Sequence, residues 1–263
     1  MEKNDKKDFV VEIISIGEEL LIGKIVNTNA TWLASRVTKL GGKVRRITVV
    51  GDDVYEIISA INEAIKRKPN LIITTGGLGP TFDDKTMEAL AKLINKPLKI
   101  NHEIANIIRE RCLRKNLPVN EKRLKMAYVP EGSKVILNRI GLAPGVIITK
   151  NNVKIVALPG VPDEMKDLFN RGIAPLICGE KFFEEELIVE DIYEADIASI
   201  IDEVMNKIPE VYIKSHPKIE DDKVVLKLHI YSRRSHEVVK NAVKMIIEKI
   251  CLTKGKIRHC LAG

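Results

Sequence analysis

Apolar segments alternate with segments of helical periodicity along the first two thirds of the chain. This alternation predicts an α/β layered domain. The expected strands are short runs rich in Ile, Val and Leu, at residues 9–16, 43–50, 71–73, 134–137, 146–149 and 153–158. The expected helices carry an apolar stripe, at residues 29–40, 54–66, 85–94 and 102–115, and a further helix starts near residue 162. Asn151 and Asn152 predict a hairpin turn between the last two strands.

The remaining third shows a different order of elements, so we expect domains at 1–178 and 179–263. Residues 175–181 combine a proline, a glycine and a switch in charge balance, as a domain boundary does. The second domain is expected to be a small β-α-β-β-α module, at residues 186–189, 195–207, 211–215, 223–232 and 235–250. We interpret it as a packing or dimerisation element, and the basic tail at 254–259 as a frayed terminus.

The stretch at residues 71–86, LIITTGGLGPTFDDKT, joins a buried strand, a glycine-rich turn, two carboxylates and a helix start. Its three glycines, Gly76, Gly77 and Gly79, allow a tight turn that brings backbone N–H groups to an anion. The adjacent Asp83 and Asp84 would repel a phosphate unless a divalent cation such as Mg²⁺ lay between them. The alternative is a simple strand-to-helix turn with an Asp N-cap and no ligand.

Two more acidic turns follow expected strands in the first domain, where ligands bind in open α/β sheets. In the first, Glu18 and Glu19 follow Gly17, with Gly23 and Asn27 just beyond. These glutamates are either metal or ribose ligands or an acidic helix N-terminus. In the second turn, Gly51 precedes Asp52, a candidate metal ligand, and Asp53, the expected cap of the next helix.

Two proline- and glycine-stiffened turns complete the set. Residues 138–145, NRIGLAPG, form a rigid loop in which Arg139 could meet a phosphate. Residues 158–165, LPGVPDEM, open a helix with Asp163 and Glu164 in its first turn. All these turns are expected at the carboxyl ends of strands, so their side chains should meet at one site.

The motifs GEELLIG, VGDD, TTGGLGPTFDD, GLAPG and LPGVP, in this order, resemble the N-terminal domain of the competence and damage-inducible CinA family. That domain is similar to the molybdopterin-binding domain of molybdenum-cofactor biosynthesis enzymes. The match covers residues 10–178 and implies a three-layer molybdopterin-binding-like fold. The second domain is similar to the KH-like middle domain of CinA proteins. The nicotinamide mononucleotide deamidase domain that often follows is not expected, because the chain ends at Gly263.

The resemblance implies hydrolysis of ADP-ribose to AMP and ribose 5-phosphate, whereas the molybdopterin relatives transfer AMP to molybdopterin. Molybdopterin adenylyl transfer and non-catalytic nucleotide or pterin binding are the alternatives. The implied cofactor is a divalent metal, Mg²⁺ or a transition metal such as Co²⁺, with K⁺ as a further candidate. Leu78 stands where true adenylyltransferases carry threonine, and Glu18 where many relatives carry Asp. The loss of a hydroxyl at Leu78 favours water as the nucleophile.

The resemblance also assigns residues to the site. The implied catalytic residues are Asp52, Asp83 and Asp84, with Asp52 and Asp84 as metal ligands. The implied substrate- and phosphate-binding residues are Gly17, Glu18, Asn27, Thr75, Gly76, Gly77, Gly79, Asn138, Gly145, Pro159 and Gly160.

Composition limits the partners. The net charge is +7, with 29 Lys and Arg against 20 Asp and Glu up to Cys178, and 14 against 16 beyond it. The basic surplus, dense at residues 109–125, either steers a polyanionic substrate such as a nucleoside diphosphate or forms a solvated helical face. The second domain is acidic and lacks the GxxG of KH modules, so no nucleic-acid partner is expected.

The same composition indicates a soluble cytoplasmic protein without a membrane partner. No segment approaches the roughly 18 uncharged apolar residues of a membrane span, and the N-terminus is charged. The four cysteines lack CxxC spacing, so neither a zinc site nor a disulfide framework is expected. The apolar stripe at Ile197, Ile200, Ile201 and Val204 predicts a homodimer, because a module of this size cannot cover two apolar faces alone.

Overall fold

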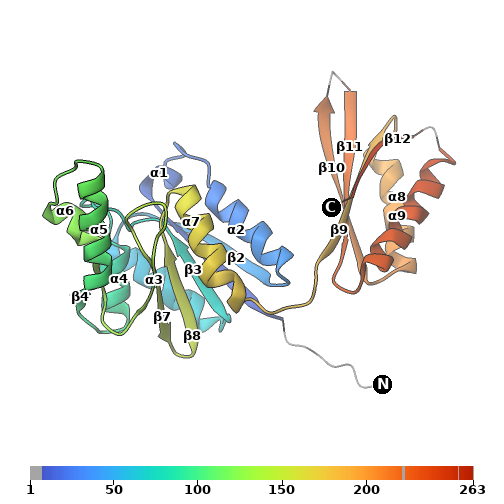
Figure 1. The fold of residues 1–263 in the computed structure, drawn as a ribbon. Coiled ribbons are helices and arrows are strands. Elements are labelled where there is room, and N and C mark those ends of the chain that lie inside the picture. The colour runs from blue at the N-terminus through green and yellow to red at the C-terminus, as the bar shows by residue number, and fades with distance from the viewer. Residues whose placement is uncertain (1–7, 221–222, 254, 263) are drawn as a thin grey trace. The chain divides into compact units, whose positions relative to one another are not determined.

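The computed structural model describes residues 8–220, 223–253 and 255–262. The chain forms two compact units (Figure 1). The first comprises the residues up to Thr38 and Gly42–Gly179, and the second groups Lys39–Gly41 with Glu180–Gly263. Each unit has its own hydrophobic core, so each is described separately.

The first unit is built on a six-stranded sheet in the order β2-β1-β3-β8-β7-β6. The neighbours among β2, β1, β3 and β8 pair in parallel, whereas β7 pairs antiparallel to β8 and to β6. The bounds are β1 (Val10–Ile16), β2 (Lys43–Val50), β3 (Leu71–Thr75), β6 (Lys134–Ile136), β7 (Gly145–Lys150) and β8 (Val153–Leu158). All five residues of β3 are buried, as expected for a parallel strand covered on both faces.

Helices cover both faces of this sheet, which confirms the predicted α/β class. Figure 1 shows α2 and α7 on one face and α3 and α4 on the other. Residues of α3, α4 and α5 share a buried cluster with Ile14 of β1 and Ile72 of β3. The helices are α1 (Glu18–Leu21), α2 (Thr28–Lys39), α3 (Val54–Lys66), α4 (Thr86–Leu93), α5 (His102–Arg114), α6 (Glu121–Lys125) and α7 (Pro162–Leu168). Between them, β4 (Leu98–Ile100) and β5 (Tyr128–Pro130) form a two-stranded sheet.

Two local predictions are confirmed. Asp53 caps α3, and its Oδ1 accepts hydrogen bonds from the N–H groups of Tyr55 and Glu56 at 2.8 and 3.0 Å. Asn151 and Asn152 adopt φ values of 50° and 63° between β7 and β8, the left-handed conformation that a tight hairpin turn requires.

The second unit has one strand more than predicted. It runs β9 (Phe183–Glu190), α8 (Glu194–Lys207), β10 (Val211–Glu220), β11 (Lys223–Ser232), α9 (His236–Ile250) and β12 (Lys256–Ala262). The expected frayed tail is wrong, because β12 pairs with the edge of β9 in the sheet β10-β11-β9-β12. The resulting β-α-β-β-α-β order is the split βαβ arrangement.

The α8 stripe does not supply the dimer surface we expected. Ile197, Ile201 and Val204 are buried in the unit's own core, and Ile200 packs against it. Both α8 and α9 contribute to this core together with the inner face of the sheet, so the stripe is used within one chain. The homodimer remains a prediction, but the apolar stripe of α8 no longer supports it.

Among the described residues, no helix combines the length and the hydropathy that a membrane span requires.

An ion pair between a buried glutamate and a half-buried arginine in the first unit generates a stability prediction. The side chain of Glu12 in β1 is 2% exposed, and Arg67 donates to its two carboxylate oxygens at 2.9 Å (Nε to Oε1) and 2.7 Å (Nη2 to Oε2). We expect Glu12→Gln to lower the unfolding free energy by about 2–4 kcal/mol, because it leaves the guanidinium without its counter-charge. Fluorescence of Trp32, the single tryptophan, reports urea unfolding of this unit. The control Glu131→Gln breaks the exposed Lys99–Glu131 pair and should cost clearly less than Glu12→Gln, because solvent screens an exposed pair. Equal losses would contradict the prediction.

Candidate functional site

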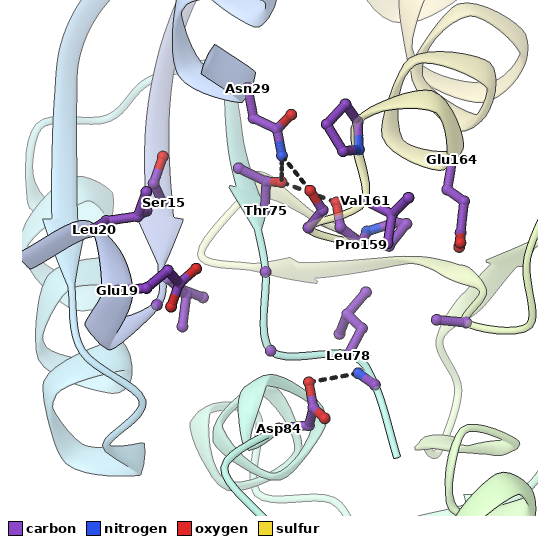
Figure 2. Close-up of a pocket in the computed structure, with 18 of the residues that line it drawn as sticks. Ser15, Glu19, Leu20, Asn29, Thr75, Leu78, Asp84, Pro159, Val161 and Glu164 are labelled. Carbon is purple, nitrogen blue, oxygen red and sulfur yellow. Dashed lines mark hydrogen bonds between the residues drawn. The ribbon is translucent and has the colours of Figure 1, made fainter. Parts of the chain in front are cut away.

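The loops at the carboxyl ends of β1, β3 and β8 surround a cavity of about 670 Å³ (Figure 2). The start of α2, the first turn of α7, Leu20, Met126 and residues 141–143 complete its walls. This is where parallel α/β sheets hold ligands, since the strands end there and the loops diverge.

The glycine turn after β3 forms the floor of the cavity. Gly76 and Gly77 have positive φ values of 111° and 65°. The Gly76 N–H donates to the carbonyl oxygen of Leu158 at 3.0 Å, and the Thr86 hydroxyl of α4 donates to the Gly76 carbonyl at 2.8 Å. Within the described part of the chain, the N–H groups of Gly77 and Leu78 have no hydrogen-bond partner. They are the donors that this turn can offer to an anion.

Asp84 organises this turn instead of capping α4. Its Oδ1 accepts from the Gly79 N–H at 2.6 Å, and its Oδ2 accepts from the N–H of Thr81 at 2.7 Å and from the Thr81 hydroxyl. Figure 2 shows the bond from Asp84 to the turn. The N-cap of α4 is Lys85, without a side-chain cap, so the interpretation of an Asp N-cap is wrong for this helix.

The exposed Asp83 also lines the cavity. The pKa of Asp83 lies below its ordinary value, because its carboxylate interacts with Thr81 and with its own backbone N–H. Lys125 and Lys85 add positive charge nearby. Asp83 is therefore ionised at neutral pH.

The two glutamates of the acidic turn after β1 lie in different places. The Glu19 carboxylate lines the cavity and lies against Gly17, where an added Cβ would meet it at 2.5 Å. Glu18 lies instead against Gly51, outside this cavity. Asp52 connects the two turns, since its Oδ2 accepts from the Glu18 N–H at 2.8 Å, and it also lines the cavity.

Two asparagines stand at the start of α2. Asn27, a predicted ligand, lines the cavity, and its side chain bonds to Ser15 and accepts from the Ala30 N–H at 3.1 Å. Asn29, which we did not predict, donates to the Gly160 carbonyl at 2.7 Å (Figure 2). Its position at the start of α2 is the sequence feature that could have indicated a role in the site. It ties the β1 side of the cavity to the loop after β8.

The structure thus brings most of the predicted site residues to one cavity. Its lining includes Gly17, Asn27, Asp52, Thr75, Gly76, Gly77, Gly79, Asp83, Asp84, Pro159 and Gly160. Glu18, Asn138 and Gly145 are not in the lining, nor is Arg139, the expected phosphate contact. The lining also contains Glu164, which the sequence placed only in a helix turn.

The lining is strongly acidic. Its ionisable side chains are Glu19, Asp52, Asp83, Asp84 and Glu164, and the described lining holds no Lys or Arg. No three His, Cys, Asp or Glu side chains of the described chain form a cluster able to hold a metal ion. Mg²⁺ commonly takes one or two protein carboxylates together with waters and substrate phosphates, and Asp52 and Asp84 both line this cavity.

Comparison with known proteins identifies relatives along most of the chain. The family model described as "Probable molybdopterin binding domain" matches residues 12–178. A curated protein of Saccharolobus islandicus is 41% identical over 258 residues, covering 95% of this chain and 98% of its own. One of Saccharolobus solfataricus is 42% identical over 243 residues, covering 91% and 88%. The crystal structure of the protein CinA with unknown function from Thermoplasma acidophilum is similar at 38% identity and a TM-score of 0.57, covering 62% of this chain and 95% of that chain.

The contacts of Asp84 and Asp52 predict different stability costs. We expect Asp84→Asn to lower the unfolding free energy by about 1–3 kcal/mol, because an amide group would turn an N–H₂ towards a donor of the turn. Asp52→Asn should cost less than about 1 kcal/mol, since its remaining oxygen can still accept from Glu18. Urea unfolding followed by Trp32 fluorescence compares the two. Equal stability of both variants would show that Asp84 does not organise the turn.

Proposed function

The chain belongs to the family of probable molybdopterin-binding domains as a CinA-like member, and on this premise we propose that it hydrolyses ADP-ribose, or a close dinucleotide, with a divalent metal. Family membership by itself supports a molybdopterin-related or nucleotide ligand. The finer proposal rests on the chemistry of the cavity.

The observation that carries the proposal is the pairing of an acidic lining with free backbone donors. Among the described residues, five carboxylates and no Lys or Arg line the cavity, so a bare diphosphate would be repelled. A divalent cation between phosphate and carboxylates removes this repulsion and stabilises charge on the phosphoryl oxygens. Within the described chain, the N–H groups of Gly77 and Leu78 have no hydrogen-bond partner, and they belong to the turn that Asp84 holds through the Gly79 N–H. They can therefore donate to the same oxygens.

The proposed reaction is attack by water on the adenylyl phosphorus. A bond forms between the water oxygen and phosphorus, and the bond from phosphorus to the bridging oxygen breaks. Ribose 5-phosphate leaves with the electron pair, AMP remains, and one proton is released. Asp52 and Asp84 would hold the metal, and the ionised Asp83 would orient the water.

Leu78 favours water over molybdopterin as the acceptor. Leu78 is 4% exposed and lines the cavity (Figure 2). An apolar group there gives a polar acceptor no hydrogen bond. Adenylyl transfer to molybdopterin would require polar contacts from other residues.

The wider expectations belong to the same proposal. We expect a cytoplasmic homodimer that acts on a small nucleotide and does not bind nucleic acid.

The test is metal-dependent release of AMP from ADP-ribose. We expect turnover with Mg²⁺ or Co²⁺, and none after chelation with EDTA. Asp52→Asn should lower turnover by about a hundredfold, equivalent to about 2.7 kcal/mol of barrier, because it removes charge at the metal without breaking the bond from Glu18. Asp84→Asn is a poorer test, because it also loosens the turn.

The matched control is Asp53→Asn in the same loop. It removes one charge, and Asn caps a helix as well as Asp. Its turnover should stay within about threefold of the unmodified protein. Near-native turnover of Asp52→Asn at saturating metal would remove Asp52 from the site, and no hydrolysis of ADP-ribose by the unmodified protein would overturn the proposed function.

A further inference from the structure

Asn138, a predicted ligand, has no hydrogen-bonding capacity left for one. Its side chain is buried, with 5% of the residue exposed. Its Nδ2 donates to the Ala143 carbonyl at 2.7 Å and to Glu164 Oε2 at 2.6 Å. Its Oδ1 accepts from the N–H groups of Ile140 and Gly141 at 2.9 and 2.8 Å. An asparagine amide can donate twice and accept twice, so all four positions are used.

These bonds make Asn138 a support for Glu164. Arg111 of α5 holds the same loop from outside the cavity, donating to the carbonyls of Asn138, at 2.8 Å, and Gly141. The Glu164 carboxylate lies directly against Gly141, where an added Cβ would lie 2.1 Å from its Cδ. The Asn138 side chain and the backbone at Gly141 therefore hold the Glu164 carboxylate from two directions. Figure 2 shows it on the α7 side of the cavity, across the view from Glu19.

The second oxygen of this carboxylate is available to a ligand. Within the described chain, Asn138 is the sole hydrogen-bond partner of the Glu164 carboxylate, so Oε1 has none. A rigidly held carboxylate can only accept hydrogen bonds, and it repels phosphate. Of the groups in a dinucleotide, the vicinal hydroxyls of a ribose offer two adjacent donors, and an acidic residue binds ribose hydroxyls in the same way in dinucleotide-binding folds.

We propose that Glu164, positioned by Asn138, is the sugar-recognition residue of the site and accepts hydrogen bonds from the vicinal hydroxyls of a ribosyl group. The inference rests on the proposed function for its substrate class. It makes Asn138 a positioning residue and Glu164 the direct contact.

Binding of the two proposed products tests this without turnover. Calorimetry with Mg²⁺ compares AMP with 2′-deoxy-AMP, and ribose 5-phosphate with 2-deoxyribose 5-phosphate. We expect at least about tenfold tighter binding of the hydroxylated member in one pair, as hydrogen bonds to a charged group provide. The pair that responds identifies which ribose of ADP-ribose lies at Glu164. No preference in either pair would overturn the inference.

Glu164→Gln sharpens the test. The Asn138 N–H₂ should still donate to the carbonyl oxygen of the new glutamine. The glutamine N–H₂ would then face the cavity and present donors where Glu164 presented an acceptor. The hydroxyl preference should fall below about threefold. Asp163→Asn, in the same turn of α7 but outside the cavity lining, is the matched control and should keep the preference. A preserved preference in Glu164→Gln overturns the inference, as does lost turnover with an unchanged preference, which would indicate a role in proton transfer.

Asn138→Asp tests the positioning role. An aspartate retains acceptors for the loop N–H groups but loses both donations and places a second carboxylate against Glu164. We expect the same loss of hydroxyl preference, with Trp32 fluorescence confirming a folded unit. An unchanged preference would show that Glu164 needs no support from Asn138. A hydroxyl preference in a protein that fails to hydrolyse ADP-ribose would overturn the proposed function alone.

Discussion

The close approach of β3 to its two neighbours determines the rest of the site. A Cβ at Gly76 would lie 2.0 Å from the Ile16 carbonyl oxygen, so only glycine fits where β3 leaves the sheet. The Gly76 N–H bonds to Leu158 at the end of β8, and the Gly17 N–H bonds to Val50 at the end of β2. These contacts align the strand ends, so that loops far apart in sequence meet around one cavity. A side chain at Gly76 would separate them and widen the floor of the site.

Glycines serve a second purpose around this cavity, because several leave room for a carboxylate. Glu19 lies against Gly17, Asp84 against Gly79, and Glu164 against Gly141. In each pair a Cβ on the glycine would lie within 3 Å of the acid. A carboxylate held this way loses little conformational entropy when a cation or hydroxyl binds, which is the advantage of preorganisation. The glycine-rich motifs therefore determine both the path of the backbone and the positions of the acids.

The parts of the structure that could be predicted depend on local rules. The Asp53 cap and the Asn151–Asn152 turn follow from short-range hydrogen bonding and backbone preference. The strand predicted at residues 71–73 follows from its apolar run, and in the structure it extends to Thr75. What could not be predicted depends on tertiary contacts. The tail became β12 because β9 offered a free edge, and nothing in the local pattern of residues 254–259 indicates that edge.

The same distinction applies to the site. Glycines and acids after strands were enough to predict which turns line this cavity, but not to assign roles to their side chains. Asn138 and Glu164 lie 26 positions apart in sequence, so their bond could not be anticipated. Asp84 was predicted at the helix start, yet its carboxylate turns back to Gly79. Side-chain direction depends on which donors the fold leaves unpaired, and that becomes known only when the loops are assembled.

The structure changes the interpretation of the positive charge of the first unit. The surplus of Lys and Arg suggested attraction of a polyanion, but the described cavity lining contains none of them. Two members of the basic cluster use their charge on backbone carbonyls. Arg111 binds those of Asn138 and Gly141, and Lys125 binds those of Thr81 and Asp84. Cations thus hold the two principal loops from outside, while carboxylates face inward. The net positive charge of this unit therefore includes residues that hold the loops in place. The affinity of the cavity for a phosphate depends instead on the cation that its carboxylates can hold.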